Sequence, residues 1–122
     1  MKPLDQAKHP VSHVCIQDNP KVTIPNFVPV VRAGFEDHGL STEVYHSEAP
    51  QDHCEYTLNY TARRSWDIGT YLSTADLELR KGAELVSRGH YHLRNKGGLS
   101  LMKWQGVESK MRPVIDEMLQ DL

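Results

Sequence analysis

Polar and apolar residues alternate through the middle of the chain with the period of a β-strand. The apolar positions of the two clearest segments are Tyr56, Leu58, Tyr60, Ala62, Ala75, Leu77 and Leu79. Side chains two residues apart share one face of a strand, so this spacing predicts strands with one dry face and one wet face. An antiparallel sheet packed on a core through one face has this pattern.

Shorter alternating segments predict three more strands. They cover residues 12–17, 41–46 and 85–94, and Lys81-Gly82 marks the turn before the last of them. Residues 63–69 interrupt the alternation, so we expect a strand end and a connection there. In the last strand, alternation places the following residues on the wet face: Val86, Arg88, His90, His92 and Arg94.

Two segments have the spacing of an amphipathic helix. In the first, Phe27, Val31 and Phe35 recur every four residues, Asn26 is placed to cap the start, and Gly39 is placed to end the helix. The second segment closes the chain, with Pro113 expected near its first turn. Its apolar stripe consists of Met111, Val114, Ile115, Met118, Leu119 and Leu122.

This order of elements predicts an α+β fold. We expect a two-layer sandwich in which a mixed sheet of four to five strands carries two helices on one face, in the order β-α-β-β-β-β-α. Residues 12–122 form a single α/β domain in this interpretation. Residues 1–11 have no periodicity and are expected to be a flexible lead-in.

Composition limits the classes of partner. The chain of 122 residues is 39% hydrophobic and 25% charged, with 14 Lys and Arg against 16 Asp and Glu. A net charge near zero gives no overall field that would attract nucleic acid, so we expect no nucleic-acid partner. No apolar run approaches the roughly 18 to 20 residues that cross a bilayer.

The chain has two cysteines, Cys15 and Cys54, which form a candidate disulfide. Such a bond would close a loop of about 40 residues, would be worth roughly 4 kcal/mol in the chain-entropy model, and would place the protein in an oxidising compartment. Two buried thiols that act as small hydrophobic side chains are the alternative. The sequence leaves both open.

The nearest approach to a metal-ligand set is His13 with Cys15 and His53 with Cys54. Their spacings fit no standard zinc pattern, because a structural zinc site usually shows two pairs of ligands with two to four residues between them. We therefore expect no metal and no other cofactor.

Candidate binding residues gather in two places. The wet strip of Arg88, His90, His92 and Arg94 is either a solvated outer face or a site for an anion or a protein partner. The second group is basic and aromatic and is more typical of packing or of a protein-binding edge than of a nucleic-acid platform. It consists of Arg63, Arg64 and Trp66.

Trp104 is a further candidate for partner binding. It ends the apolar segment 99–104, which is either an extra edge strand or an exposed lip for a partner. Elsewhere the chain has no nucleophile elbow, no glycine-rich phosphate loop and no zinc-helix motif. We expect no catalytic residues and no enzyme, although a triad assembled only in space would escape this test.

Three stretches carry a resemblance to a known family. Gly39–Val44, Cys54–Tyr60 and Ala75–Gly82, together with the closing helix, resemble the small periplasmic α/β domains of Gram-negative envelope lipoproteins. This family includes transport auxiliary lipoproteins and the amino-terminal domain of TolB. The resemblance covers residues 12–122 and rests on the arrangement of elements, so no site residue is carried over.

The resemblance implies a non-enzymatic periplasmic domain that binds or scaffolds an envelope protein, with an anchor in the outer membrane as one form. Members are usually tethered through a lipidated cysteine near their start, whereas Cys15 lies within a predicted strand, so any lipid tether would precede Met1. A cytoplasmic domain that binds an anionic ligand through its Arg/His face is the alternative, and a small hydrolase with an unrecognised site is a third. The sequence does not indicate an oligomeric state.

Overall fold

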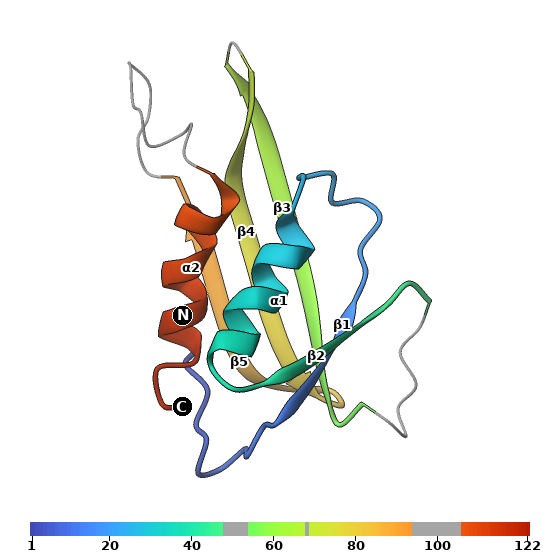
Figure 1. The fold of residues 1–122 in the computed structure, drawn as a ribbon, viewed down its shortest axis with the longest axis vertical. Helices are drawn as coiled ribbons and strands as arrows, with labels where there is room; N and C mark the ends of the chain where they lie inside the picture. Colours follow the sequence, from blue (N-terminus) through green and yellow to red (C-terminus); the bar gives the residue numbers. More distant parts are fainter. Residues whose placement is uncertain (48–53, 68, 94–105) are drawn as a thin grey trace.

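A computed structural model describes residues 1–47, 54–67, 69–93 and 106–122 (Figure 1). The elements in chain order are β1 (His13–Gln17), α1 (Phe27–Asp37), β2 (Ser41–Tyr45), β3 (Tyr56–Asp67), β4 (Gly69–Lys81), β5 (Glu84–His92) and α2 (Val107–Met118). Of the predicted site residues, His53, Arg94 and Trp104 lie outside the described residues, as does the segment 99–104.

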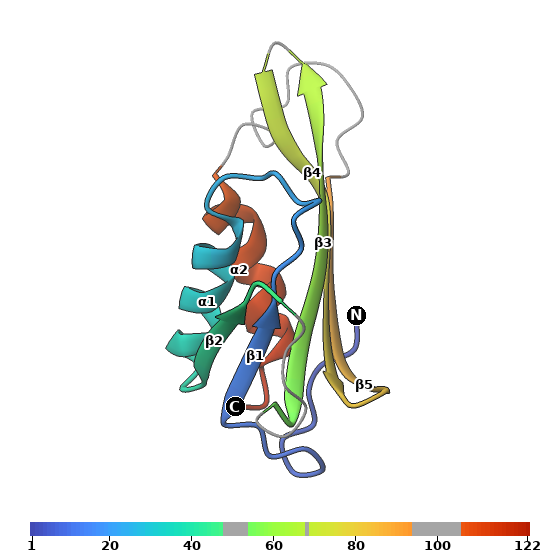
Figure 2. The ribbon, with the colours of Figure 1, turned by 90° about the vertical axis from the view of Figure 1, so that its right-hand side faces the viewer.

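The five strands form one mixed sheet in the order β2-β1-β3-β4-β5. β1 runs parallel to β2 and to β3, whereas β3, β4 and β5 form an antiparallel meander. Both helices lie on the same side of the sheet, as Figure 2 shows edge-on. The protein is thus an α+β two-layer sandwich with five strands, as the sequence predicted.

The core lies between this sheet and the two helices. The predicted dry faces point into it: Leu58, Leu77 and Leu79 are fully buried. The stripe of α1 is also buried at Phe27, Val31 and Phe35, as is that of α2 at Met111, Val114, Ile115, Met118 and Leu119. Burial of these apolar faces is the main force holding the helices to the sheet.

Two glycines, Gly89 and Gly34, lie where α2 comes too close for any side chain. A Cβ on Gly89 of β5 would lie 2.5 Å from Met118 Sδ and 2.6 Å from Val114 Cγ1. A Cβ on Gly34 of α1 would lie 2.8 Å from Ile115 Cδ1. These neighbours all belong to α2, so α2 is seated in a space that only glycine leaves open at these two positions.

The ends of α1 agree with the prediction only in part. Gly39 has φ 87° just after the helix, as expected of a residue that ends it. Asn26 does precede the helix, but its side chain makes no capping hydrogen bond, because its backbone is left-handed with φ 63° instead of extended.

The closing helix differs from the prediction at three positions. Pro113 lies inside α2 and not near its first turn, since the helix already begins at Val107. Leu122 is 39% exposed, because it follows the end of the helix. The stripe also contains Lys110, whose Nζ donates to Leu72 O at 2.9 Å and lies 5.6 Å from the Tyr71 ring centre, while burial lowers the pKa of this amine.

The expected strand end at residues 63–69 is wrong. β3 continues to Asp67 and pairs with β4 up to Gly69. The register shifts between Arg63 and Arg64, and a bulge of this kind changes the alternation without ending the strand.

A second register shift corrects the expected face of Val86. Leu79 pairs with Ser87, but Arg80 pairs with Leu85, so Val86 is the extra residue on β5. Val86 is buried instead of facing solvent with the predicted wet strip. The bulge rotates the strand locally and so breaks the simple period of two.

Residues 1–11 are not a loose lead-in. Leu4 and Val11 are 1% and 3% exposed, within the same core as the sheet and helices. The amide of Lys2 donates to Arg88 O and the amide of Arg88 donates to Lys2 O, so this segment covers part of the edge of β5. Apolar anchors and an edge with unpaired backbone groups hold the segment in place.

Candidate functional site

The face of the sheet opposite the helices carries most of the candidate functional side chains. We call it the open face, because neither helix covers it (Figure 2). Residues that alternate with the buried positions point to this side, and the registers bring them into rows across the strands. Among the described strand residues, two groups with a histidine and a carboxylate occur on it, one on β1 and β2 and one on β4 and β5.

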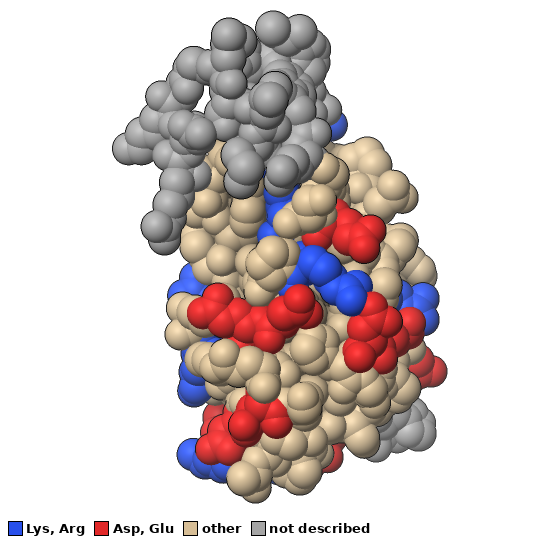
Figure 3. Space-filling model, turned by 60° about the vertical axis from the view of Figure 1, so that its left-hand side comes forward, with Lys and Arg blue, Asp and Glu red and all other residues tan. Residues whose placement is uncertain are grey.

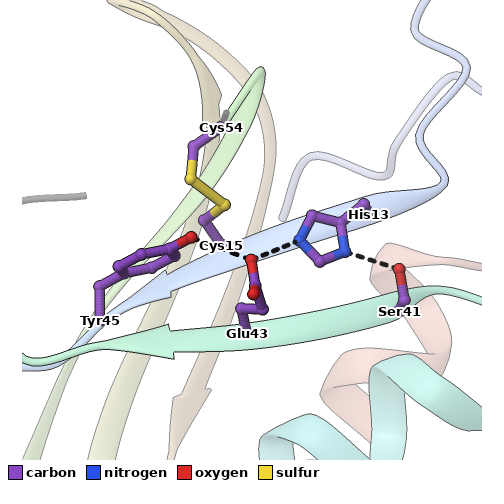
Figure 4. Close-up of a disulfide and its surroundings, with 6 residues drawn as sticks. All are labelled: His13, Cys15, Ser41, Glu43, Tyr45 and Cys54. Carbon is purple, nitrogen blue, oxygen red and sulfur yellow. Dashed lines mark hydrogen bonds and ion pairs between the residues drawn. A yellow bond between two sulfur atoms is a disulfide. The ribbon is translucent and has the colours of Figure 1, made fainter. Parts of the chain in front are cut away.

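The first group, the His13 cluster, consists of His13, Ser41, Glu43 and Tyr45 (Figure 4). Parallel pairing sets His13 opposite Ser41. His13 Nδ1 lies 2.6 Å from Ser41 Oγ, and His13 Nε2 lies 3.2 Å from Glu43 Oε2. The Tyr45 hydroxyl donates to the same Glu43 oxygen at 2.9 Å.

Ser41 also donates its hydroxyl hydrogen to Ser12 O at 3.3 Å. A carboxylate can only accept, so His13 Nε2 is the donor in the contact with Glu43. In the contact between His13 Nδ1 and Ser41 Oγ, the donor is set by the protonation state of the ring, because a neutral imidazole that donates from Nε2 accepts at Nδ1 and a protonated one donates from both nitrogens.

Directly beside the His13 cluster, Cys15 and Cys54 form a disulfide (Figure 4). It connects the middle of β1 to the residue two positions before β3, and its Cα atoms are 5.7 Å apart. Both cysteines are buried. Of the two states that the sequence left open, the structure has the disulfide.

The second group, the Asp76 cluster, consists of Asp76 on β4 with Arg88 and His90 on β5. Arg88 Nη2 and His90 Nδ1 both lie 2.8 Å from Asp76 Oδ1. Partial burial alone raises the pKa of the Asp76 carboxyl, but the hydrogen bonds from His90 and Arg88 outweigh it and hold that pKa below its usual range. His92 stacks on His90 with ring centres 6.3 Å apart.

Two shallow depressions meet at Asp76. One, of about 260 Å³, is lined by Gln17, Asp18, Asn19, Asn59, Tyr60, Thr61, Asp76 and Glu78. The other, of about 530 Å³, is lined by Asn19, Lys21, Val22, Thr61, Ala62, Arg63, Thr74, Asp76 and His90. Most of the lining residues are polar and they carry charges of both signs, so this part of the open face suits contact with a polar partner surface.

The structure brings only some of the predicted binding residues together. Arg88, His90 and His92 are neighbours on β5, and Arg63 lines the same depression as His90. Arg64 is exposed on β3, and Trp66 belongs to the same strand. The predicted cationic strip is not a free positive surface, because Asp76 binds both Arg88 and His90.

Charges of both signs also meet on the helix layer. Arg112 of α2 pairs with Asp37 of α1, and His38 Nε2 lies 2.8 Å from Asp116 Oδ1. On the face shown in Figure 3, basic and acidic patches lie next to each other. This distribution matches the near-neutral composition and gives that face no single-sign field.

Sequence reasoning singled out His13 and Cys15 but missed the partners of His13 on β2 and the role of Asp76. Ser41, Glu43 and Tyr45 have the alternation of one strand face, which was a usable signal. What brings them to His13 is the parallel register of β1 and β2 across the helix between them. Neither strand contains a signal for that register.

Comparison with known proteins identifies the fold alone. No family model matches the chain, and no curated protein matches its sequence. Among solved structures, it is similar to a PelC dodecamer from Paraburkholderia phytofirmans, with a TM-score of 0.52 and 14% sequence identity. That similarity covers 85% of this chain and 89% of the PelC chain. The chain therefore shares its architecture with a chain of the PelC dodecamer.

Proposed function

We propose that this chain is a non-enzymatic binding or scaffold domain of the cell envelope that works in the periplasm. The observation that carries the proposal is the Cys15–Cys54 disulfide, which uses both cysteines of the chain. Disulfides form and persist in oxidising compartments and are rare in the reducing cytosol. Neither helix of the described part of the chain has the length and apolar character needed to cross a bilayer.

The open face supports a binding role. It is polar, lies outside the core, and holds both depressions next to Asp76. A protein partner could contact it without displacing a helix. The fold also occurs in the PelC dodecamer, so scaffolding through several copies is compatible with this architecture.

The anion-binding alternative loses support, because Arg88 and His90 are already engaged with Asp76.

The redox state of the cysteines in the source cells tests the compartment. Cells would be quenched with acid, and free thiols would be alkylated with a maleimide that adds visible mass on a gel. We expect no added mass without reductant and two additions after reduction. Two additions without prior reduction would refute the oxidising compartment.

Site-specific photocrosslinking tests the binding face. A photoreactive amino acid at Asn59, exposed on the open face, is compared with one at Glu117, exposed on α2. We expect crosslinks to envelope proteins mainly from position 59. Equal yields from both positions would argue against the open face as the binding surface.

A further inference from the structure

Three potential metal donors lie together where the disulfide meets the His13 cluster. The ligand atoms of His13, Cys15 and Glu43 all lie within 4.8 Å of one another. Cys54 Sγ is bonded to Cys15 Sγ, so a second sulfur lies next to this group. Two cysteines, a histidine and a carboxylate are all donor types that zinc uses in proteins.

The spacing of the nitrogen and oxygen donors matches a tetrahedral site. Zinc binds imidazole nitrogen and carboxylate oxygen at about 2.0 to 2.2 Å, so two such donors in a tetrahedron are about 3.4 Å apart. His13 Nε2 and Glu43 Oε2 are 3.2 Å apart. Their side chains are 35% and 57% exposed, so an ion can reach them from solvent.

Hydrogen bonds already orient both donors. The contact of His13 Nδ1 with Ser41 Oγ holds the ring so that Nε2 points toward Glu43. The Tyr45 hydroxyl holds the Glu43 carboxylate from the other side. Metal-binding histidines and carboxylates usually have such partners, which fix the ligand before the metal arrives.

The sulfurs are the missing part of the site. Sulfur binds zinc as thiolate, and the two sulfurs of a disulfide are bonded to each other and carry no charge. We propose that reduction of the Cys15–Cys54 disulfide turns this cluster into a zinc site, with Cys15, Cys54, His13 and Glu43 as its ligands. The expectation from sequence was that the chain holds no metal; the proposal departs from it for the reduced chain.

The chemistry balances with a dithiol as reductant. The dithiol gives two electrons and two protons to the S–S bond, which breaks into two thiols while the dithiol becomes a disulfide. Zinc then displaces the two thiol protons to solvent. Two thiolates bound to one zinc are about 3.8 Å apart. Cα atoms separated by 5.7 Å allow this through side-chain rotation.

The test compares metal binding by the oxidised and the reduced chain. The chain would be reduced with dithiothreitol without oxygen, freed of reductant by gel filtration, and titrated with Co²⁺, whose thiolate charge-transfer and tetrahedral d–d bands report the site. Zn²⁺ should then displace Co²⁺ at one ion per chain. We expect these bands in the reduced chain and not in the oxidised one.

Variants of His13 and Glu43 test whether these two residues bind the ion or whether the two sulfurs bind it alone. His13→Ala and Glu43→Gln should each weaken Zn²⁺ binding at least about tenfold, since the first removes the imidazole and the second replaces the charged carboxylate with a neutral amide. His92→Ala removes an exposed histidine elsewhere on the open face and should leave binding unchanged. Equal binding by all three variants would overturn the proposal, as would equal binding by the oxidised and reduced chains.

Loss of the disulfide can also loosen the fold, so a second measurement follows folding. Zn²⁺ should raise the melting temperature of the reduced wild-type chain but not of reduced His13→Ala. The same rise in both, or no rise in either, would overturn the zinc site. The zinc site and the periplasmic location are tested separately. Reduced cysteines in cells would refute the periplasmic location, whereas a reduced chain that binds no Zn²⁺ would refute the zinc site.

Discussion

The open face carries two clusters of similar composition that differ in how they are assembled. The Asp76 cluster is formed by neighbouring strands of one hairpin, and its carboxylate is matched by Arg88 and His90. The His13 cluster joins β1 and β2 across a helix, and its carboxylate faces one imidazole and one hydroxyl beside two sulfurs. The first cluster pairs its carboxylate with two cationic side chains, whereas the second sets its carboxylate beside the sulfur and the imidazole that the proposed zinc site would use.

Removing the disulfide should have the largest effect and should act mainly on the His13 cluster. The Cys15→Ser/Cys54→Ser double variant should lose about 4 kcal/mol of unfolding free energy, because the bond closes a loop with a sequence separation of 39. Urea unfolding measures the loss. Hydrogen exchange should speed up in β1 more than in β5, and equal acceleration would contradict the local difference.

Gly89→Ala should lower the free energy of unfolding by disturbing β5, the strand that supplies Arg88 and His90 to the Asp76 cluster. An added Cβ lies within 3 Å of Met118 and Val114, so α2 or β5 must shift, at a cost of about 1 to 3 kcal/mol. Gly106→Ala is the control, because no atom lies within 4 Å of its added Cβ, and the weaker helix cap should cost only about 0.5 kcal/mol. Equal loss in the two variants would mean that α2 is not packed this closely on β5.

Asp76→Asn should cost no more than about 1 kcal/mol at neutral pH, since both partners are substantially exposed. The folded pKa of Asp76 is lowered, so its stabilisation is present above the unfolded pKa of about 3.9 and is lost as pH falls through the lower folded value. Unfolding free energies of both chains, measured from pH 7 to pH 2, should converge at the acidic end. A gap that stays constant would refute the charged role of Asp76.

Ser41→Ala should have the smallest effect. The hydrogen bond to His13 is exposed, so the unfolding free energy should change by less than about 0.5 kcal/mol. The orientation of the ring should change more, because Ser41 directs His13 Nδ1. Chemical shifts of the His13 ring nitrogens measure this, with those of His90 as the internal control, and an unchanged His13 spectrum would contradict the assigned hydrogen bond.

Local patterns predicted the elements well where one face is buried. Leu58, Leu77 and the stripes of α1 and α2 point where their periods placed them. The prediction failed where a period is broken inside an element, as at Arg63 and Val86, and where a segment without any period is packed, as at Leu4. A bulge adds one residue without a mark in the sequence, and a single apolar side chain has no period.

The amino-acid sequence alone determined that this chain builds a sheet with one solvent-exposed face and two helices on the other face. This is because the spacing of apolar residues along one element directly sets which of its faces is buried. The tertiary structure alone decided which side chains meet. Without the bulge at Leu79 and Arg80, Asp76 would lie opposite Gly89 and not His90. His13 reaches Ser41 and Glu43 only through the parallel register between β1 and β2, which are joined across α1. Register is a property of pairs of strands, so no single strand's sequence contains it.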